Sequence, residues 1–221
     1  MARPRRDEEP HVSDARAEIL GKIERAVRTG RIPGGEPHGE PAAVKTGSES
    51  TLSNADRFIL EARALGVEVF VEWSAEAVRE RLALLTSGKR VLAWHPNRLP
   101  YKAGDALPGA VSGAASKAEQ ARADVGVTGC HGAIAETGSL ALIEGSGCSR
   151  TVSLLPPVHV ALVRRADLVA TMGEFFTARA DAMAQSANCT FVTGPSRTAD
   201  IELSLTIGVH GPGKVVVILG P

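Results

Sequence analysis

From Asn54 onward the sequence alternates between short apolar segments and segments with helical periodicity, and no other feature constrains the fold as strongly. This alternation is typical of an α/β protein in which a mostly parallel sheet carries helices on both faces. Because the segments between 124 and 164 have no long helix between them, we expect a mixed sheet there. Strands are predicted at 67–72, 90–95, 124–128, 139–144, 158–164, 190–193 and 214–220, and helices at 54–64, 75–85, 116–122 and 173–185.

The first 50 residues have a different character. After Ser13, which suits a helix N-cap, apolar residues recur at helical spacing up to Val27. Residues 31–50 are rich in Gly, Pro and Ser, a composition typical of a mobile linker. We therefore predict a helical arm with a linker over 1–50 and one α/β domain over 51–221.

The composition disfavours several classes of protein. Aromatic residues make up only 4% of the chain and 25 basic residues balance 25 acidic ones, which argues against binding to nucleic acid or to an anionic membrane surface. No apolar run approaches the roughly 20 residues that cross a bilayer. The basic start MARPRRDEEP also lacks the apolar segment of a secretory signal. We expect a cytoplasmic protein without a membrane span.

The cysteines are three in number and lie far apart in the sequence, at Cys130, Cys148 and Cys189. An odd, widely spaced set argues against a disulfide framework and against a self-contained four-cysteine iron–sulfur cluster. No CxxC pair indicates a zinc site. We expect this chain to bind no metal ion and no cofactor of its own.

A first glycine-rich stretch, 128–140, follows a predicted strand and is a candidate site because parallel sheets bind ligands beyond the carboxyl ends of their strands. Gly129 and Gly138 allow the backbone to turn tightly and to approach a ligand closely. Glu136, followed by Thr137, lies between apolar residues and a turn, where burial raises the pKa of a carboxyl group toward that of a working acid, base or nucleophile. The alternative is that Glu136 accepts backbone N–H bonds and fixes the turn.

The adjacent pair Cys130 and His131 suggests a thiolate–imidazole site. Neighbouring side chains on extended backbone point to opposite faces, however, so the two do not readily pair with each other. We predict His131 as a ligand-contacting residue and give less weight to a catalytic Cys130. His159, within an apolar run, is expected to be a hydrogen-bonded core histidine.

A second glycine-rich stretch, 193–213, contains further candidates. The turn at Gly194 and Ser196, together with Arg197, is suited to hold an anion. Asp200 and Glu202 are alternate residues that share one face of extended backbone, with helix capping or surface solvation as the alternative. Before the last strand, His210 and its neighbour Gly211 lie in a tight turn, where the imidazole either contacts a ligand and transfers protons or fixes the turn.

Two nucleotide-binding interpretations fail on their context. Residues 208–214 match G-x-x-x-x-G-K, but Val215 replaces the Ser or Thr that holds magnesium, and a strand follows where a helix is required. Residues 145–150 place Arg150 where a dinucleotide fingerprint needs Gly or Ala.

Four motifs in order carry a resemblance to a known family: GAIAETGSL at 132–140, LLPPVH at 154–159, TGPSRTADIE at 193–202 and GVHGP at 208–212. Together they resemble the LUD-domain family of the lactate utilization protein C (LutC/YkgG) type. The motif residues that match include the predicted catalytic residues Glu136, Asp200 and His210. The matching ligand-binding candidates are Thr137, Gly138, Gly194, Ser196, Glu202 and Gly211.

The resemblance implies a three-layer αβα sandwich similar to the NagB/RpiA/CoA transferase fold. It also implies a role in the oxidation of L-lactate to pyruvate as a cluster-free subunit beside iron–sulfur partner proteins, and leaves open whether this subunit is catalytic or completes a complex. Two alternatives remain: a free-standing enzyme of the CoA-transferase or sugar-phosphate isomerase type that uses Glu136, and a regulatory protein that binds a small carboxylate or phosphate. In each case Glu136, Asp200, Glu202 and His210 are predicted to converge.

Overall fold

The computed structural model describes residues 12–29, 52–199 and 205–221. The chain divides into two compact units, 1–45 and 46–221, which are described separately. In the first, helix α1 (Val12–Thr29) carries a Glu18–Lys22 ion pair one turn apart and leaves apolar side chains such as Ile19 and Ile23 exposed. No helix within the described ranges is long and apolar enough to span a membrane.

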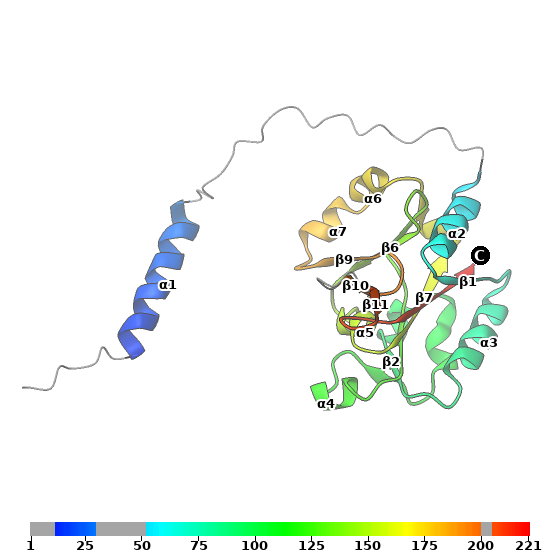
Figure 1. The fold of residues 1–221 in the computed structure, drawn as a ribbon, viewed down its shortest axis with the longest axis horizontal. Coiled ribbons are helices and arrows are strands. Elements are labelled where there is room, and N and C mark those ends of the chain that lie inside the picture. The colour runs from blue at the N-terminus through cyan, green and yellow to red at the C-terminus, as the bar shows by residue number, and fades with distance from the viewer. Residues whose placement is uncertain (1–11, 30–51, 200–204) are drawn as a thin grey trace, which may run out of the picture. The chain divides into compact units, whose positions relative to one another are not determined.

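The second unit, here called the α/β unit, is built on a six-stranded parallel sheet (Figure 1). The pairs of neighbouring strands are parallel, which requires the crossover connections that the alternating sequence predicts. In spatial order its strands are β1 (Glu68–Val71), β12 (Lys214–Gly220), β7 (Val158–Arg164), β4 (Val125–Thr128), β2 (Val91–Ala93) and β3 (Val111–Ser112).

Alternate residues of the central strands face two separate cores. Val216 and Ile218 of β12 belong to one core, while Val217 and Leu219 belong to the other. Both faces of the sheet are therefore buried, which explains why 214–220 is a nearly continuous apolar run. The first core is covered by α3 (Ala75–Thr86) and α5 (Thr151–Leu154), and the second by α2 (Asn54–Ala64) together with a second sheet.

The second sheet is mixed, with one parallel pair and two antiparallel pairs. On its far side Phe175 packs against Ile134 and Ile143, so helix α6 (Met172–Ala178) forms a further layer (Figure 1). Its strands in spatial order are β8 (Leu168–Val169), β5 (Gly132–Ile134), β6 (Ser139–Ile143) and β9 (Cys189–Val192). A separate antiparallel hairpin consists of β10 (Arg197–Ala199) and β11 (Leu205–Ile207).

The mixed α/β architecture with a mostly parallel central sheet confirms the predicted fold class. Three local predictions need correction. The helix expected at 173–185 breaks at Arg179 into α6 and α7 (Ala180–Ala184). The loop expected at 96–113 contains two 3₁₀ helices, η1 (Pro96–Arg98) and η2 (Pro100–Ala106), and strand β3. The mixed strands after β4 form their own sheet rather than extending the central one.

The order of the strands creates a topological switch point between β2 and β4. From β2 the chain continues to β3 on one side, and from β4 it continues through the second sheet to β7 on the other side. In open α/β sheets, ligands bind in the crevice outside the carboxyl ends of two such strands. The carboxyl ends of β2 and β4 are therefore the first place to look for a site.

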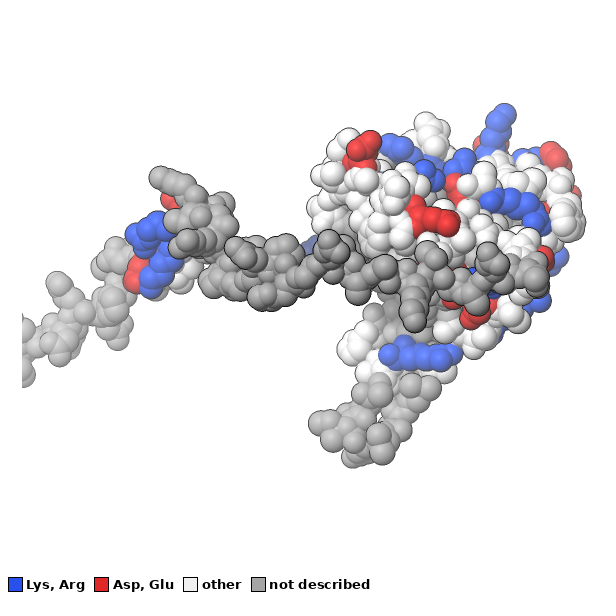
Figure 2. Space-filling view, turned by 90° about the horizontal axis from the view of Figure 1, so that it is seen from above, with Lys and Arg blue, Asp and Glu red and all other residues white. Residues whose placement is uncertain are grey.

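Charges of both signs lie on the face of the α/β unit that Figure 2 shows. Figure 2 shows Lys and Arg side chains interspersed with Asp and Glu on the visible face. This agrees with the balanced count of 25 basic and 25 acidic residues. Any strong preference for an anion must therefore come from a local arrangement of side chains.

His159 on β7 is buried completely, and its Nε2 lies 2.9 Å from the hydroxyl of Thr128. The predicted core position is confirmed, but its Nδ1 is a buried atom without a hydrogen-bond partner among the described residues. Burial lowers the pKa of this imidazole from 6.5 to about 4. Between about pH 4 and pH 6.5, His159 is therefore neutral in the folded protein and protonated in the unfolded chain.

We predict that His159 makes the fold sensitive to acid. Its contribution is complete above pH 6.5 and is lost as the pH falls toward 4, because the unfolded state binds the proton first. Between pH 7 and pH 4.5 this amounts to about 2–3 kcal/mol. His159→Gln, which does not titrate, should show a correspondingly smaller loss in urea unfolding at the two pH values. Equal pH dependence of wild type and variant would contradict the prediction.

Candidate functional site

A cavity of about 250 Å³ lies at the carboxyl ends of β2, β4 and β7, where the topology predicts a ligand site. We call it the arginine cavity. The connection after β2 provides one wall, the residues after β4 a second, and the end of β7 a third. It is lined by Trp94, Asn97, Arg98, Leu99, Pro100, Cys130, His131, Cys148, Arg164 and Asp167.

The charged centre of this cavity is an ion pair between a buried carboxylate and an exposed arginine side chain. Asp167 in the short 3₁₀ helix η3 (Arg165–Asp167) is only 4% exposed, and Arg164 at the end of β7 grips both of its carboxylate oxygens at 2.7 Å. The Nη2 of Arg179 approaches the same carboxylate at 3.9 Å. With Arg98 also in the wall, the positive charges outnumber the negative one, which favours an anionic ligand.

His131 contributes a neutral hydrogen-bond donor to the wall. Its Nδ1 accepts the backbone N–H of Ile143 at 3.0 Å, which places the ring proton on Nε2. Burial, and then the charge of Arg179, lower the pKa of this imidazole. The ring also packs against Trp94, with 5.4 Å between ring centroids. His131 is thus held in one orientation and one tautomer.

The loop carrying His131 is positioned by two close contacts. Arg179 donates from Nε to the carbonyl oxygen of His131 at 2.8 Å. At Gly129 an added Cβ would lie 3.2 Å from the carbonyl oxygen of Arg98 and 3.3 Å from Pro100. Glycine therefore lets the loop after β4 pack directly against the loop after β2.

The thiol of Cys130 is poorly suited to act as a nucleophile. Burial raises its pKa well above the ordinary value, and the nearby carboxylate of Asp167 raises it further. Burial also raises the pKa of Cys148. Because the thiolate is the reactive form of cysteine, both side chains are expected to remain protonated and act as part of the wall.

Tyr101 anchors the segment that forms the β2 wall. Its hydroxyl reaches the carbonyl oxygen of Val163 at 3.1 Å, and Arg79 donates to the Tyr101 carbonyl oxygen at 2.9 Å. Burial, and then Asp167, raise the pKa of Tyr101 to about 12. Tyr101 and Lys102 both have positive φ, at 62° and 53°, a conformation that persists only where the surroundings hold it.

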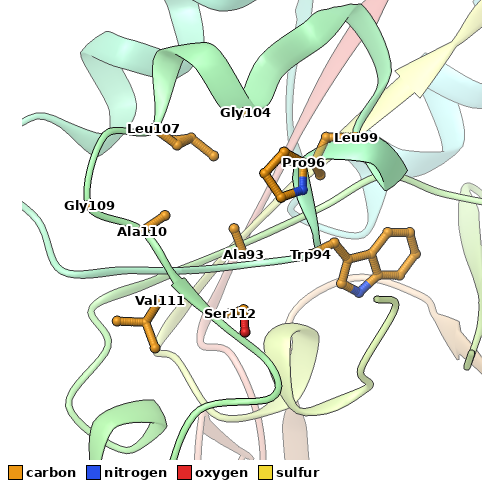
Figure 3. A pocket seen from close by; sticks show the side chains of 10 residues that line it. All are labelled: Ala93, Trp94, Pro96, Leu99, Gly104, Leu107, Gly109, Ala110, Val111 and Ser112. Atoms are coloured by element: carbon orange, nitrogen blue, oxygen red, sulfur yellow. The ribbon is translucent and has the colours of Figure 1, made fainter. Parts of the chain in front are cut away.

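A smaller apolar cavity of about 110 Å³ lies beneath the same segment, between β2 and β3 (Figure 3). The side chains of Pro96, Leu107 and Ala110 point toward its centre, while the indole of Trp94 points away (Figure 3). Trp94 also lines the arginine cavity. Its lining is apolar apart from Ser112, so it offers little to orient a polar ligand and we treat it as a packing defect beneath η2.

Glu136 lies in a backbone-capping position. Its Oε1 accepts the N–H of Met172 at 2.7 Å, at the first residue of α6. This geometry is that of the alternative in which Glu136 accepts a backbone N–H and fixes the turn. A catalytic role for Glu136 stays a prediction. The following Gly138, at φ +62°, packs so closely on α2 that an added Cβ would clash with the backbone of Ala62.

The two glycine-rich stretches meet through hydroxyl groups. Thr137 donates to Ser139 at 2.8 Å, and the Ser139 hydroxyl lies 2.8 Å from that of Thr193. This contact follows from the pairing of β6 with β9. It brings the turn of the first stretch close to the beginning of the second.

The second stretch forms the β10–β11 hairpin and the turn before β12. Gly194 has φ +81°, and Ser196 exchanges backbone hydrogen bonds with Pro212 and Gly208. Arg197 donates to the carbonyl oxygen of Leu65 at 2.6 Å, so part of its guanidinium group already has a partner.

His210 is exposed, with Gly211 beside Ser196. Asp200 and Glu202 lie outside the described residues. The convergence of these two residues with Glu136 and His210 therefore stays a prediction.

Of the residues singled out from the sequence, Cys130 and His131 line the arginine cavity, and Gly129 lies against the loop that forms its β2 wall. The charged residues Arg98, Arg164 and Asp167 were missed. The available signal was the position of Arg164 at the end of a buried strand, where charge is uncommon unless paired. Within the described residues, no group of three or more His, Cys, Asp or Glu side chains is arranged to hold a metal ion.

Comparison with known proteins identifies the family of this chain. A family model described as the LUD domain matches residues 9–219. Lactate utilization protein C of Halalkalibacterium halodurans is 38% identical over 107 residues, which cover 47% of this chain and 46% of the relative. The protein of that name from Bacillus subtilis is 39% identical over 111 residues, covering 47% of this chain and 44% of the relative. The matched part thus spans about half the length of these curated relatives.

A solved structure shares the fold. A crystal structure of a DUF162 family protein from Deinococcus radiodurans superposes with a TM-score of 0.63 at 27% sequence identity. The match covers 77% of this chain and 99% of that chain.

We predict that Tyr101→Phe destabilises the α/β unit by about 1 kcal/mol, the usual contribution of one hydrogen bond. The ring still fills its place, so the loss reports on the hydroxyl group, which lies 3.1 Å from the carbonyl oxygens of both Val163 and Pro221. The free energy of unfolding in urea measures it. An unchanged value would show that Tyr101 does not anchor the segment through its hydroxyl group.

Proposed function

Because this chain belongs to the LUD domain family, we propose that it acts in lactate utilization as a cluster-free subunit that binds a small carboxylate in the arginine cavity. In this proposal it supports the oxidation of L-lactate to pyruvate, and iron–sulfur partner proteins accept the electrons. The names of its relatives support the pathway. The observation that carries the binding site is the excess of arginine side chains around one buried carboxylate at the switch point.

The arginine cavity has the donors that a 2-hydroxycarboxylate requires. Guanidinium groups present parallel N–H donors that match the two oxygens of a carboxylate. Arg164 uses Nε and Nη2 for Asp167, which leaves donors on its Nη1 for a ligand. The Nε2–H of His131 provides a neutral donor for the oxygen on the neighbouring carbon. A molecule of lactate size is small enough for a cavity of about 250 Å³.

Arg98 is the side chain best suited to test this site. Removing Arg164 would leave Asp167 buried without its partner, which destabilises proteins strongly. Arg98 instead lies on the exposed rim and donates from Nε to the carbonyl oxygen of Ser146 at 3.1 Å. Its replacement by Gln removes the charge with little effect expected on folding.

We predict that Arg98→Gln weakens L-lactate binding at least tenfold, by about 1.4 kcal/mol, as expected for the loss of a charge-assisted hydrogen bond. Isothermal titration calorimetry with L-lactate and pyruvate measures the effect. The exposed Arg122→Gln is the matched control and should bind as the wild type does. In a strain that lacks this chain, the control should restore growth on L-lactate and Arg98→Gln should not. Undiminished binding by Arg98→Gln would refute the proposed site.

A Glu136→Gln variant separates this proposal from an enzyme that uses Glu136 as its acid, base or nucleophile. The amide oxygen of Gln can still accept the N–H of Met172, so a capping role should survive. We predict a melting temperature and an L-lactate affinity close to those of the wild type, with growth on L-lactate retained. Lost growth with unchanged affinity would instead assign Glu136 to the chemical step.

A further inference from the structure

A second cavity of about 380 Å³ lies next to the arginine cavity, beyond the ends of β2 and β3. We call it the serine cavity. Its walls come from the residue after Trp94, the turn that follows β3, and a glycine-rich turn between β6 and α5. It is lined by His95, Ser112, Gly113, Ala114, Gly145, Ser146, Gly147 and Ser149.

A hydrogen-bonded partition separates the two cavities. The backbone N–H of His95 donates to the carbonyl oxygen of Gly147 at 2.9 Å. The indole of Trp94 donates to the carbonyl oxygen of Ser149 at 3.1 Å, and Arg98 donates to that of Ser146. Trp94 and Arg98 line one cavity, while the acceptors line the other. The serine cavity is therefore a compartment of its own with a fixed shared wall.

The lining of the serine cavity selects for a neutral, hydroxyl-bearing ligand. It contains no Lys, Arg, Asp or Glu side chain, so a charged group placed there would lack an ionic partner. Apart from the imidazole of His95, it contains no large aliphatic or aromatic side chain against which a purely apolar ligand could pack. Three serine hydroxyls line it instead. The Ser112 oxygen accepts the backbone N–H of Ala114 at 3.2 Å and keeps its O–H for a ligand, and the Ser149 hydroxyl lies 2.9 Å from that of Thr151.

The imidazole of His95 adds a directional donor. Its Nδ1 accepts the backbone N–H of Asn97 at 3.3 Å, which places the ring proton on Nε2. A vicinal diol combines donors and acceptors at short spacing and complements both this N–H and the serine hydroxyls. The ring of a ribose carries such a diol.

Gly145, in the lining of the serine cavity, has open space beside its backbone. Its φ lies outside the left-handed region, and an added Cβ would meet no protein atom within 4 Å. Neither backbone conformation nor packing therefore requires glycine at this position. The neighbouring Gly147 differs, since it has φ +79° and lies against His95.

We propose that the serine cavity is a second binding site, which recognises the vicinal diol of a ribose ring. The two hydroxyl oxygens of the diol occupy the space between the hydroxyls of Ser112, Ser146 and Ser149. The Nε2–H of His95 donates to one of these two oxygens. The site operates independently of the arginine cavity because the partition belongs to the protein and not to either ligand. Both a free pentose and a nucleoside present this diol.

The test is binding to the full-length protein, measured by isothermal titration calorimetry with D-ribose, adenosine and 2′,3′-dideoxyadenosine. We expect adenosine to bind and the dideoxy compound, which lacks the diol, to bind at least tenfold more weakly. Binding of D-ribose alone would show that the diol suffices, and binding of adenosine alone that the base contributes as well. No binding of either at millimolar concentration, or equal binding of the dideoxy compound, would overturn the proposal.

Gly145→Leu is the decisive variant, because Gly145 lines the cavity and an added Cβ there meets no protein atom within 4 Å. We expect it to weaken adenosine binding at least tenfold while its melting temperature and its response to L-lactate stay those of the wild type. Gly173→Leu, at an exposed glycine with similar free space on α6, is the matched control. Ser146→Ala, which removes one hydroxyl and adds no bulk, should weaken binding severalfold. Adenosine affinity unchanged by both Gly145→Leu and Ser146→Ala would place the ligand elsewhere.

Discussion

The pairing of β7 with β12 is the constraint on which the rest of the α/β unit depends. The two strands run parallel over seven residue pairs, from Val158 opposite Lys214 to Arg164 opposite Gly220. Their alternate side chains fill both cores, and burial of each large apolar side chain contributes about 1.5–3 kcal/mol. A shift of one residue would exchange the two faces of a strand and move its apolar side chains into the wrong core. The register of this pair thus fixes the position of the β7 end, where Arg164 lies.

The site at the end of β7 is organised around one buried charge, the carboxylate of Asp167. Asp167 is tolerated at 4% exposure because Arg164 pairs with both of its oxygens and Arg179 stands nearby. Arg179 in turn holds the carbonyl oxygen of His131. One carboxylate therefore links the end of β7, the helix pair after the second sheet and the loop after β4. Tyr101 ties the fourth element, the segment after β2, to the same strand end.

The sequence predicted the strands with strong local signals and missed what distant pairing assembles. Strands 158–164 and 214–220 were predicted to the residue, since β-branched runs buried on both faces are distinctive. Strands of two or three residues, such as β3 and β8, show no periodicity to detect. At the site, Gly129 and His131 stood out in a glycine-rich stretch. Arg98, Arg164 and Asp167 did not. Arg164 and Asp167 form a local pair three residues apart, and only the order of the strands brings Arg98 to them.

The partition between the two cavities shows how one short connection serves two purposes. The residues after β2 present Trp94 and Arg98 to the arginine cavity and His95 to the serine cavity. The three hydrogen bonds of the partition end on backbone carbonyl oxygens of the turn at Ser146–Ser149, so side-chain exchange in that turn leaves the wall intact. Arg98 takes part in this wall. A ligand in the arginine cavity can therefore affect binding in the serine cavity only if the hydrogen bond from Arg98 Nε to the Ser146 carbonyl oxygen breaks. The retained bonds of His95 and Trp94 oppose that movement, which favours two ligands that bind side by side without coupling.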